Sequence, residues 1–258
     1  MPAVKRTGNF TVVRNTDLTP RHFLLELLAP QKLPEMFPGQ FVQVLVENSP
    51  STFLRRPFSI HHLDTKENTI RLLIQVKGDG TRKLRQLRPG ESVNLLFPLG
   101  NSFSIPERSD VLLIGGGCGV APLLFLAMSL HGKGISPSIL IGARSKKDLF
   151  ELEEYRKCGN VYITTEDGSE GEKGLVTDHS ILQKEKLTWT AICCCGPDAM
   201  MRSVAAIARS HGIRCEVSLE NLMACGFGVC LCCITPTTSG NQRVCMEGPV
   251  FEAGMLGW

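Results

Sequence analysis

The first part of the chain alternates short apolar runs with turn-forming residues. Between residues 9 and 98, six runs rich in β-branched and apolar residues recur, and most are bounded by glycine, proline, asparagine or aspartate. Strands at this spacing are typical of a small antiparallel barrel. The runs are FTVVRN, HFLLELL, QFVQVLVE, PFSIHHL, TIRLLIQV and SVNLLFP. Between the last two, residues 81–87 (TRKLRQL) predict a short helix or turn that Thr81 can cap.

The pattern changes after residue 103 to longer, alternating segments. Residues 111–117 (VLLIGGG) form a continuous apolar run, as expected of a strand buried on both faces, and Pro122 opens a helical stretch that ends at Gly132. Strict alternation of strands and helices beyond this point predicts a parallel α/β sheet. Strands are expected at 138–144, 160–167, 190–196 and 213–220, and helices at 147–157, 176–184 and 197–212.

Regular periodicity stops after Glu220. The tail carries clustered cysteines in a loop, a turn at TPTTSGNQ and short strands around RVCM and PVF. A segment this small buries too little apolar surface to hold itself together, which suits a bound cluster acting as a covalent staple. The fold class is therefore multi-domain. We expect an antiparallel β-barrel over residues 1–103, an α/β parallel-sheet domain over 104–219 and a small C-terminal domain over 220–258.

Composition excludes several classes of protein. The formal net charge is only +3 over 258 residues, so neither nucleic acid nor an anionic membrane surface is indicated as a partner. The chain begins MPAVKRTGNF with no apolar segment after its basic residues, so its eleven cysteines are not read as a secreted disulfide framework. No apolar run approaches the roughly 18 residues that a membrane span needs. We expect a cytoplasmic protein in a reducing compartment.

The cysteine pattern of the tail points to redox chemistry. Residues 225–233 (CGFGVCLCC) place Cys225, Cys230 and Cys233 in the spacing C-x4-C-x2-C, and Cys245 follows further on. This is an iron–sulfur ligand spacing, and it predicts a [2Fe–2S] cluster held by these four thiolates. The loop glycines permit the tight curl that such a site needs and expose N–H groups that can hydrogen-bond sulfur.

Zinc and disulfides are the alternatives for these cysteines. A structural zinc site usually uses two C-x2-C pairs, whereas the loop has one tight pair of that spacing, Cys230 and Cys233. Disulfides would require a secreted chain. Cys232 is expected not to be a ligand, because the x2 spacing from Cys230 selects Cys233.

Two further segments can bind a nucleotide phosphate at a sheet edge. Residues 115–122 (GGGCGVAP) lie where a strand meets a helix, so backbone N–H groups and the helix dipole favour an anion there. The segment departs from a strict G-x-G-x-x-G, and a glycine turn that only packs the helix closely is the alternative. Residues 193–197 (CCCGP) end a strand at the carboxyl edge where ligands bind in open α/β folds, or are simply buried small side chains.

Two segments of the barrel region can face a flat, phosphorylated ligand. Residues 55–59 (RRPFS) combine a guanidinium for phosphate, a ring for an aromatic system and a hydroxyl. An exposed basic pair on a strand edge is the alternative. Residues 78–81 (GDGT) make either a second anion-binding corner or a plain hairpin turn.

These motifs follow one another along the chain in the order RRPFS, GDGT, GGGCGVAPLL, CGPDAMM and then CGFGVCLCC followed by GPVF. Their order resembles that of the electron-transfer subunits of NAD-dependent dihydroorotate dehydrogenases, within the ferredoxin reductase superfamily. The resemblance covers nearly the whole chain, and the cysteine loop with GPVF is its specific part. It implies FAD at Arg56, Pro57, Phe58, Ser59, Gly78, Gly80 and Thr81. It implies NAD at Gly115, Gly116, Gly117, Gly119, Cys195, Gly196 and Pro197. It implies [2Fe–2S] ligation by Cys225, Cys230, Cys233 and Cys245.

The resemblance also implies a function shared with a partner. An FMN-containing dihydroorotate dehydrogenase catalytic subunit would oxidise dihydroorotate to orotate in pyrimidine biosynthesis, and this chain would pass the electrons through [2Fe–2S] and FAD to NAD+. The assembly is expected to be a hetero-oligomer, a heterotetramer in the first instance. Because the cofactors carry the chemistry, no catalytic acid or base is expected in this chain.

Two other functions stay open at this stage. One is a flavin and iron–sulfur subunit of another NAD(P)-linked oxidoreductase, in which an Asp often stands where this chain has Cys225. The other is a non-enzymatic, zinc-stabilised adaptor whose glycine turns are structural. NADP in place of NAD is also open, because the basic residues at 144–147 (RSKK) follow the second strand of the α/β region.

Overall fold

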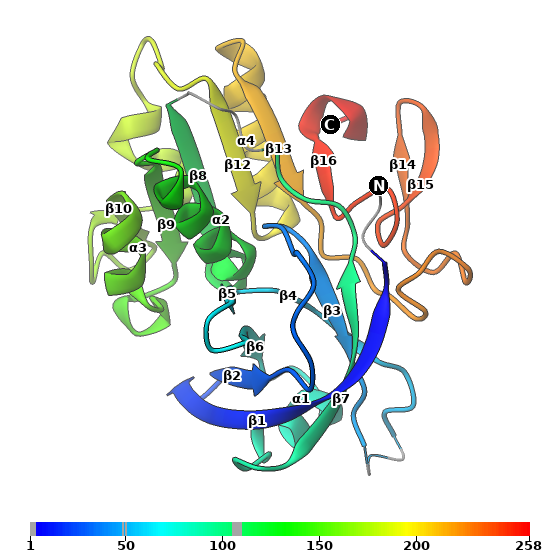
Figure 1. The fold of residues 1–258 in the computed structure, drawn as a ribbon. Helices are drawn as coiled ribbons and strands as arrows, with labels where there is room; N and C mark the ends of the chain where they lie inside the picture. The colour runs from blue at the N-terminus through cyan, green and yellow to red at the C-terminus, as the bar shows by residue number, and fades with distance from the viewer. Residues whose placement is uncertain (1–3, 48, 50, 105–109) are drawn as a thin grey trace. The chain divides into compact units, whose positions relative to one another are not determined.

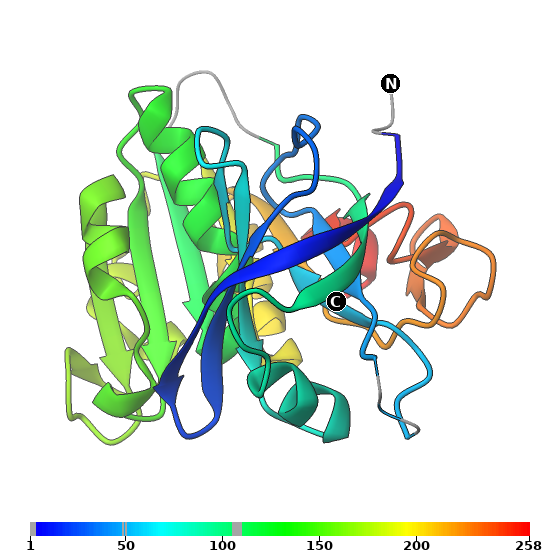
Figure 2. The same ribbon diagram turned by 60° about the horizontal axis from the view of Figure 1, so that its bottom comes forward.

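The structure is a computed structural model that describes residues 4–47, 49, 51–104 and 110–258, drawn as ribbons in Figures 1 and 2. The chain divides into two compact units. The first, here called the barrel unit, comprises Met1–Ser102, Glu220–Thr235 and Gln242–Pro249. The second, the α/β unit, comprises Phe103–Leu219, Pro236–Asn241 and Val250–Trp258.

The barrel unit is built on one antiparallel sheet of seven strands in the order β4-β3-β7-β1-β2-β6-β5. Strand β4 also contacts β6, so the sheet curls back toward itself as a half-barrel. The antiparallel sheet class predicted from the sequence is confirmed. The strands are β1 (Arg6–Thr19), β2 (His22–Leu28), β3 (Phe41–Val44), β4 (Arg56–Ser59), β5 (His62–Asp64), β6 (Thr69–Gln75) and β7 (Ser92–Leu99).

One predicted strand, residues 57–63, is in fact two. The amide of Ile60 donates to the carbonyl of Gln40 at 3.0 Å, whereas the amide of the next residue, His61, donates to the carbonyl of Arg71 at 3.0 Å. The backbone therefore changes partners between these residues, which makes a corner that closes the curled sheet. The hydrophobic pattern runs through the corner unbroken, so it gives no sign of the change.

Alternate residues of the strands form the barrel core. Phe10, Phe23, Leu25, Leu72 and Leu95 are fully buried. Each such side chain stabilises the fold by about 1.5–3 kcal/mol relative to exposure. Figure 2 shows β1 as a long, curved, dark-blue strand, and its register with β2 shifts at two places, as β-bulges do where a strand bends.

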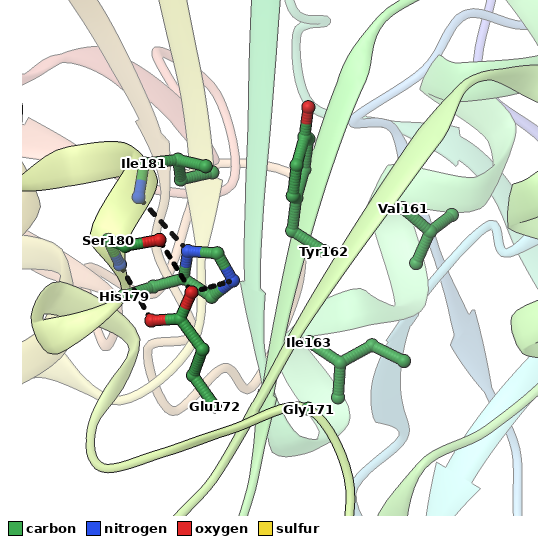
Figure 3. A pocket seen from close by; sticks show the side chains of 8 residues that line it. All are labelled: Val161, Tyr162, Ile163, Gly171, Glu172, His179, Ser180 and Ile181. Carbon is green, nitrogen blue, oxygen red and sulfur yellow. Dashed lines mark hydrogen bonds and ion pairs between the residues drawn. The ribbon is translucent and has the colours of Figure 1, made fainter.

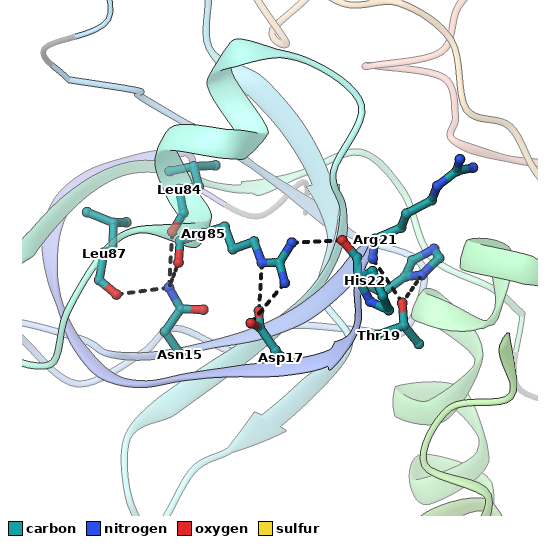
Figure 4. Close-up of polar contacts among 9 residues, drawn as sticks. Asn15, Asp17, Thr19, Arg21, His22, Leu84, Arg85 and Leu87 are labelled. Atoms are coloured by element: carbon teal, nitrogen blue, oxygen red, sulfur yellow. Dashed lines mark hydrogen bonds and ion pairs between the residues drawn. The ribbon is translucent and has the colours of Figure 1, made fainter. Parts of the chain in front are cut away.

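The long strand β1 also anchors helix α1 (Asp79–Arg85), which begins within the GDGT segment with Gly78 as its N-cap (Figure 4). The side-chain amide of Asn15 donates to the carbonyls of Leu84 at 3.1 Å, Arg85 at 3.1 Å and Leu87 at 2.9 Å. These carbonyls lie at the end of the helix and just beyond it, where the regular hydrogen bonds of the helix stop. Next to it, Asp17 accepts from Arg85 Nε at 2.8 Å and Nη2 at 2.9 Å. The sequence prediction placed this helix two residues too late, at 81–87.

We expect Asn15→Ala to lower the free energy of unfolding by about 1–2 kcal/mol, because the carbonyls of Leu84, Arg85 and Leu87 lose the side-chain donor of Asn15. Asp17→Ala serves as the matched comparison on the same strand. It should cost less than about 1 kcal/mol, because that ion pair is exposed and screened by water. Urea denaturation of the full chain followed by fluorescence measures both values. A larger loss for Asp17→Ala would contradict this account of how α1 is held.

The α/β unit is a seven-stranded sheet in the order β11-β10-β9-β8-β12-β13-β16, parallel except for the antiparallel edge strand β16. Helices α2 and α3 contact each other, and α4 packs against β12 and β13. The parallel α/β sheet predicted from the sequence is confirmed. Its strands are β8 (Val111–Gly116), β9 (Ser138–Ala143), β10 (Asn160–Thr165), β11 (Glu172–Lys173), β12 (Ala191–Cys195), β13 (Arg214–Ser218) and β16 (Val250–Glu252), and its helices are α2 (Ala121–Gly132), α3 (Leu152–Cys158) and α4 (Asp198–Ser210).

The helix predicted at 176–184 is wrong. This stretch forms two short 3-10 turns, η3 (Val176–Asp178) and η4 (Ser180–Leu182), separated by an extended His179. Side chains take backbone donors that a helix over these residues would need. Glu172 accepts from the amide of Ser180 at 2.8 Å, and Nδ1 of His179 accepts from the amide of Ile181 at 3.1 Å.

The helix predicted at 147–157 is shorter than expected. A 3-10 turn, η2 (Lys146–Asp148), precedes it, and α3 begins only at Leu152. Leu149 is extended and Glu151 has a φ of 47°, so the chain leaves helical geometry between the two segments.

The tail residues complete both units. A two-stranded ribbon pairs β14 (Ile234–Thr237) with β15 (Gly240–Arg243), and a last 3-10 turn, η5, spans Ala253–Leu256. In the barrel unit, the amide of Asn101 donates to the carbonyl of Gly248 at 2.7 Å, which ties the end of β7 to the tail. Across the described residues, no helix is both long enough and apolar enough to cross a membrane.

Candidate functional site

The cysteine loop, residues 222–233 of the barrel unit, wraps its backbone around the sulfur of Cys225. That sulfur accepts from the amides of Phe227 at 3.5 Å and Val229 at 3.4 Å, and the amide of Cys225 donates to the sulfur of Cys230 at 3.5 Å. Gly226 and Gly228 have φ angles of 77° and 91°, which allow the loop to turn twice within four residues. Cys225 and Cys230 therefore form one pair of adjacent thiols.

The other two predicted ligands form a second, buried pair. The amide of Cys245 donates to the sulfur of Cys233 at 3.4 Å, and the amide of Val244 donates to the carbonyl of Cys233 at 3.0 Å. The Cys245 thiol also interacts electrostatically with Cys225, so the two pairs lie close enough to feel each other's charge. The structure thus brings all four sequence-predicted cysteines together in one region of the barrel unit.

Two of these thiols, one from each pair, differ in their proton affinity. At Cys225, burial raises the pKa, but the backbone donors around the sulfur outweigh it and bring the pKa down to about 6. At Cys245, burial and the neighbouring Cys233 thiol raise the pKa to about 12. Metal ligation requires thiolates, so positive charge must be bound before Cys245 loses its proton.

Two pairs of cysteines match the ligand count of a binuclear cluster, with two sulfurs for each iron. Among the described residues, no group of three or more His, Cys, Asp or Glu is placed so that it could hold a metal ion. A structural zinc site needs four ligands around one centre, whereas the four cysteines of a [2Fe–2S] cluster are shared between two irons. Cys232 lies outside both pairs, since it is exposed and its thiol approaches the carbonyl of Leu222 at 3.7 Å.

The loop is braced from the tail by an ion pair. Arg243 donates from Nη1 to the carbonyl of Gly228 at 3.2 Å and from its amide to Glu247 Oε2 at 2.7 Å. Arg243 holds the pKa of Glu247 below its usual range through hydrogen bonds, so the pair stays charged at neutral pH. A Cβ on Gly228 would lie 2.6 Å from Met246 Cγ, so the loop packs directly on this bracing segment.

In the RRPFS segment, predicted to bind flavin, the two arginines have different roles. Arg55 is engaged by the protein, whereas Arg56 is available to a ligand. Arg55 donates to the carbonyls of Gln43 at 3.3 Å and Asn94 at 3.2 Å, and burial lowers its pKa. Arg56 donates to the carbonyls of Leu54 and Arg55, and among the described residues no carboxylate pairs with it. All four residues of β4 are half-buried on an edge strand, so Arg56, Pro57, Phe58 and Ser59 remain accessible to a ligand.

Some backbone donors of the GDGT segment are already hydrogen-bonded within the protein. The Thr81 hydroxyl accepts from the amides of Lys77 at 2.9 Å and Gly78 at 3.1 Å, so it caps the turn rather than waiting for a ligand. A Cβ on Gly80 would lie 2.9 Å from Thr52 Cγ2, which explains the glycine by packing. The segment that leads into β4 therefore touches this turn, and the two flavin motifs belong to one corner of the barrel unit.

In the α/β unit the two predicted nicotinamide motifs are in direct contact. A Cβ on Gly119 would lie 2.5 Å from the carbonyl oxygen of Cys195 and 2.5 Å from the Cα of Gly196, so only glycine allows this approach. A Cβ on Gly116 would lie 3.2 Å from Pro197. The glycines do not lead straight into the helix as predicted, because a 3-10 turn, η1 (Gly117–Val120), intervenes.

A buried tyrosine that the sequence analysis missed supports this mouth. Tyr155 of α3 donates its hydroxyl hydrogen to the carbonyl of Val120 at 2.7 Å, and it is only 1% exposed. Burial raises its pKa well above its usual value, so it stays a neutral donor. It fixes the end of η1 from the neighbouring helix.

A separate pocket of about 380 Å³ lies beside β10 and β11 (Figure 3). Within it, His179 accepts from the amide of Ile181 at 3.1 Å and faces Glu172 at 3.5 Å. Burial lowers the pKa of His179, and Glu172 only partly offsets this effect. None of the sequence-predicted site residues lines the pocket, so it is not part of the predicted cofactor sites.

We expect Gly226→Ala to empty the cysteine loop of iron. The new Cβ would lie 2.6 Å from Gln43 Nε2 and 2.8 Å from Gln43 Cγ, and φ is positive. Overpacking of this kind costs about 1–3 kcal/mol, with the strain of the left-handed backbone in addition. Iron and acid-labile sulfide per chain give the readout.

Gly240→Ala is the matched control for this experiment. Gly240 also has a positive φ, of 104°, but nothing lies within 4 Å of its added Cβ. It should keep its iron, since only backbone strain is added. Full iron content in Gly226→Ala would show that the loop does not rest on Gln43 as described.

Comparison with known proteins finds three domain families along the chain. Family models match for an oxidoreductase FAD-binding domain over residues 10–103, an oxidoreductase NAD-binding domain over 113–206 and the iron–sulfur cluster binding domain of dihydroorotate dehydrogenase B over 220–257. The chain thus has domains for FAD, NAD and an iron–sulfur cluster.

Whole-chain relatives carry one name. The chain is 34% identical over 257 residues to "Dihydroorotate dehydrogenase B (NAD(+)), electron transfer subunit" of Shouchella clausii, covering 97% of this chain and 98% of that protein. It is 38% identical to the Bacillus caldolyticus protein of the same name, over 84% of this chain and 85% of the other. Among solved structures, an NADH-dependent reduced ferredoxin-NADP oxidoreductase matches with a TM-score of 0.87 and 28% identity, covering 96% of this chain and 90% of that chain.

Proposed function

Because this chain belongs to the family of dihydroorotate dehydrogenase B (NAD(+)) electron transfer subunits, we propose that it carries electrons between a partner subunit and NAD+. The electrons come from the FMN of a dihydroorotate dehydrogenase catalytic subunit and pass through [2Fe–2S] and FAD in pyrimidine biosynthesis. One observation carries the proposal: four cysteines form two pairs, and backbone amides around them donate hydrogen bonds to their sulfurs. That geometry suits a one-electron carrier at the tail of a nucleotide-binding reductase.

The proposal assigns three functional parts to the chain. Residues 1–103 bind FAD, residues 104–219 bind NAD and residues 220–258 bind the cluster. Support for this division comes from the ranges of the three matching family models. By the contacts of the backbone, most of the cysteine segment packs within the barrel unit, so the cluster-binding part depends on the barrel for its support.

In the cluster part, Cys225, Cys230, Cys233 and Cys245 are the proposed ligands. The amides of Phe227 and Val229 then donate to a thiolate that carries negative charge. Hydrogen bonds to ligand sulfur are one of the means by which a protein sets a cluster potential. Arg243 keeps these amides in place through the carbonyl of Gly228.

In the flavin and nicotinamide parts, the protein supplies position and charge. The proposed FAD residues are Arg56, Pro57, Phe58, Ser59, Gly78, Gly80 and Thr81. Arg56 offers a guanidinium to phosphate, and Phe58 offers a ring face to an aromatic system. The proposed NAD residues are Gly115, Gly116, Gly117, Gly119, Cys195, Gly196 and Pro197, and the close contact of Gly119 with Cys195 and Gly196 fixes the shape of that mouth.

The bound groups supply the redox chemistry, since a flavin exchanges two electrons with a nicotinamide and single electrons with an iron–sulfur cluster. The chain's own residues therefore bind and orient these groups. No side chain of the chain is assigned a proton-transfer role. Tyr155, the buried donor closest to the nicotinamide motifs, is already engaged with the carbonyl of Val120.

The partner and the compartment complete the proposal. We take the partner to be the FMN-containing catalytic subunit, in a heterotetramer. A cytoplasmic location is supported by the cysteines, all eleven of which are free thiols. Disulfides persist in oxidising compartments, whereas free thiols suit a reducing one.

A second candidate is a flavin and iron–sulfur subunit of another NAD(P)-linked oxidoreductase. It is favoured by the 28% identity to the ferredoxin-NADP oxidoreductase chain over 96% of this chain. Against it stands Cys225, where such chains often carry Asp. Use of NADP in place of NAD would draw on the basic segment at 144–147 to bind the extra phosphate. Within that segment, Lys146 already forms an ion pair with Glu170 at 2.9 Å.

We expect the purified chain to reduce an artificial acceptor with NADH but to form no orotate from dihydroorotate. The reason is that the chain has no residue assigned to dihydroorotate, whereas its own cofactors connect NADH to an acceptor. Adding the catalytic subunit should create NAD+-dependent orotate formation. Orotate formation by the chain alone would overturn the division of labour, and a colourless preparation without flavin or iron would overturn the proposal itself.

We expect the exposed apolar side chains of the cysteine loop to contact the partner. Phe227 is 45% exposed and Leu231 is 56% exposed, both beside proposed ligands, and electron transfer requires close approach. Phe227→Ser and Leu231→Asn should each weaken co-purification with the catalytic subunit by at least about tenfold, or about 1.4 kcal/mol. Asn suits Leu231 because its φ is 59°.

Leu175→Asn is the matched control, since Leu175 is 59% exposed and belongs to the α/β unit. It should leave complex formation unchanged. Unchanged complex formation and electron transfer in both loop variants, with iron content intact, would remove the loop from the partner interface.

A further inference from the structure

Gln43 is a buried polar side chain that finds no partner in the part of the chain that the structure describes. It lies in β3, is fully buried, and neither its Oε1 nor its Nε2 has a hydrogen-bond partner among the described residues. Burying an unpaired amide costs about 1–3 kcal/mol, so natural proteins rarely keep one without a reason. Because both ends of the amide are unpaired, a donor remains unused whichever way the amide is turned.

Its surroundings show where that donor is aimed. Gly226, which directly follows Cys225, lies over the amide: a Cβ built on Gly226 would be 2.6 Å from Gln43 Nε2 and 3.0 Å from Gln43 Cδ. The backbone of Gln43 is held in place without help from its side chain. Its carbonyl accepts from Arg55 Nη1 at 3.3 Å, and Gln43 lies opposite Pro57 in the pairing of β3 with β4. The side chain is thus held under the cysteine loop by a rigid strand.

A second buried glutamine in the same unit shows what a structural role looks like. Gln40 is 5% exposed, and both ends of its amide are paired. Its Nε2 donates to the carbonyl of Gly100 at 3.3 Å, and its Oε1 accepts from the amide of Phe37 at 2.8 Å. Gln43 has the same chemistry and is buried still more deeply, but it has no such partners among the described residues, so packing alone does not account for it.

We propose that the Gln43 side-chain amide donates a hydrogen bond to a sulfur atom of the cluster held by the cysteine loop, and thereby favours the reduced cluster. The inference rests on the proposed function, since it requires that the loop binds [2Fe–2S]. Reduction adds one electron and therefore negative charge to the cluster. A neutral N–H donor stabilises that charge without adding a cation to a buried site.

The test uses the cluster-loaded full chain and measures the midpoint potential of the cluster by redox titration followed by electron paramagnetic resonance. Gln43→Leu should lower the equilibrium constant for one-electron reduction on the order of tenfold, which corresponds to about 59 mV. Gln43→Glu keeps the side-chain volume and replaces the N–H donor by a carboxylate. Its cluster should therefore be at least as hard to reduce as that of Gln43→Leu. Gln40→Leu is the control and should leave the potential unchanged.

A spectroscopic signature separates contact with the cluster from an indirect effect. With glutamine side chains labelled by ¹⁵N, the reduced wild-type cluster should show a weak hyperfine coupling to nitrogen that Gln43→Leu lacks and Gln40→Leu retains. A structural role for Gln43 would not produce that coupling.

Three results overturn the inference: potentials of both Gln43 variants equal to wild type, a shift in the FAD potential in place of the cluster potential, or loss of the cluster from both Gln43 variants. The first shows that no hydrogen bond of consequence exists, the second that the amide serves the flavin, and the third that it serves assembly. Failure of the proposed function gives a different result, because the wild-type chain would then contain neither iron nor acid-labile sulfide.

Discussion

The arrangement of the barrel unit depends on holding four cysteine sulfurs near one another. Thiolates in such proximity repel, and a buried one such as Cys245 gives up its proton only when positive charge is bound. The loop answers this with backbone donors. The amides of Phe227 and Val229 converge on Cys225 and bring its pKa to about 6, against the effect of burial. Cys225 is therefore prepared for ligation, whereas Cys245 keeps its proton until positive charge is bound.

This constraint explains why so much of the surrounding structure is backbone packed on side chain. The donors reach sulfur only if the loop turns through Gly226 and Gly228, and both glycines approach neighbouring side chains too closely for a Cβ. Beneath the loop lies Gln43 on β3, and beside it lies Arg243 with its carboxylate partner. The α/β unit uses the same device at Gly119, where the glycine turn meets the backbone of Cys195 and Gly196. In both units, glycines are placed where the backbone of a proposed site must come close to other protein atoms.

The sequence predicted those parts of the molecule that local spacing encodes. Apolar periodicity found most strands of both sheets but not the short β11, and cysteine spacing found the four sulfurs that the structure brings together. The prediction failed where side chains or other strands take the backbone groups of a segment. The helix expected at 176–184 is broken because Glu172 and His179 accept from the amides of Ser180 and Ile181, and the corner at Ile60 and His61 arises from partners on two different strands. Gln43 and Tyr155 could not be predicted, because neither has a local pattern and each acts through a residue distant in the chain.

The unsatisfied amide of Gln43 and the satisfied amide of Gln40 differ in a way that bears on function. A fold gains stability when a buried polar group is paired internally, as Gln40 is with Phe37 and Gly100. It loses stability when such a group is left for a ligand, and the loss is recovered only when the ligand binds. Buried, unpaired donors therefore mark places where the protein alone is incomplete. That such a donor lies directly under the glycine next to Cys225 ties the barrel sheet, and not only the cysteine loop, to the electronic properties of the cluster.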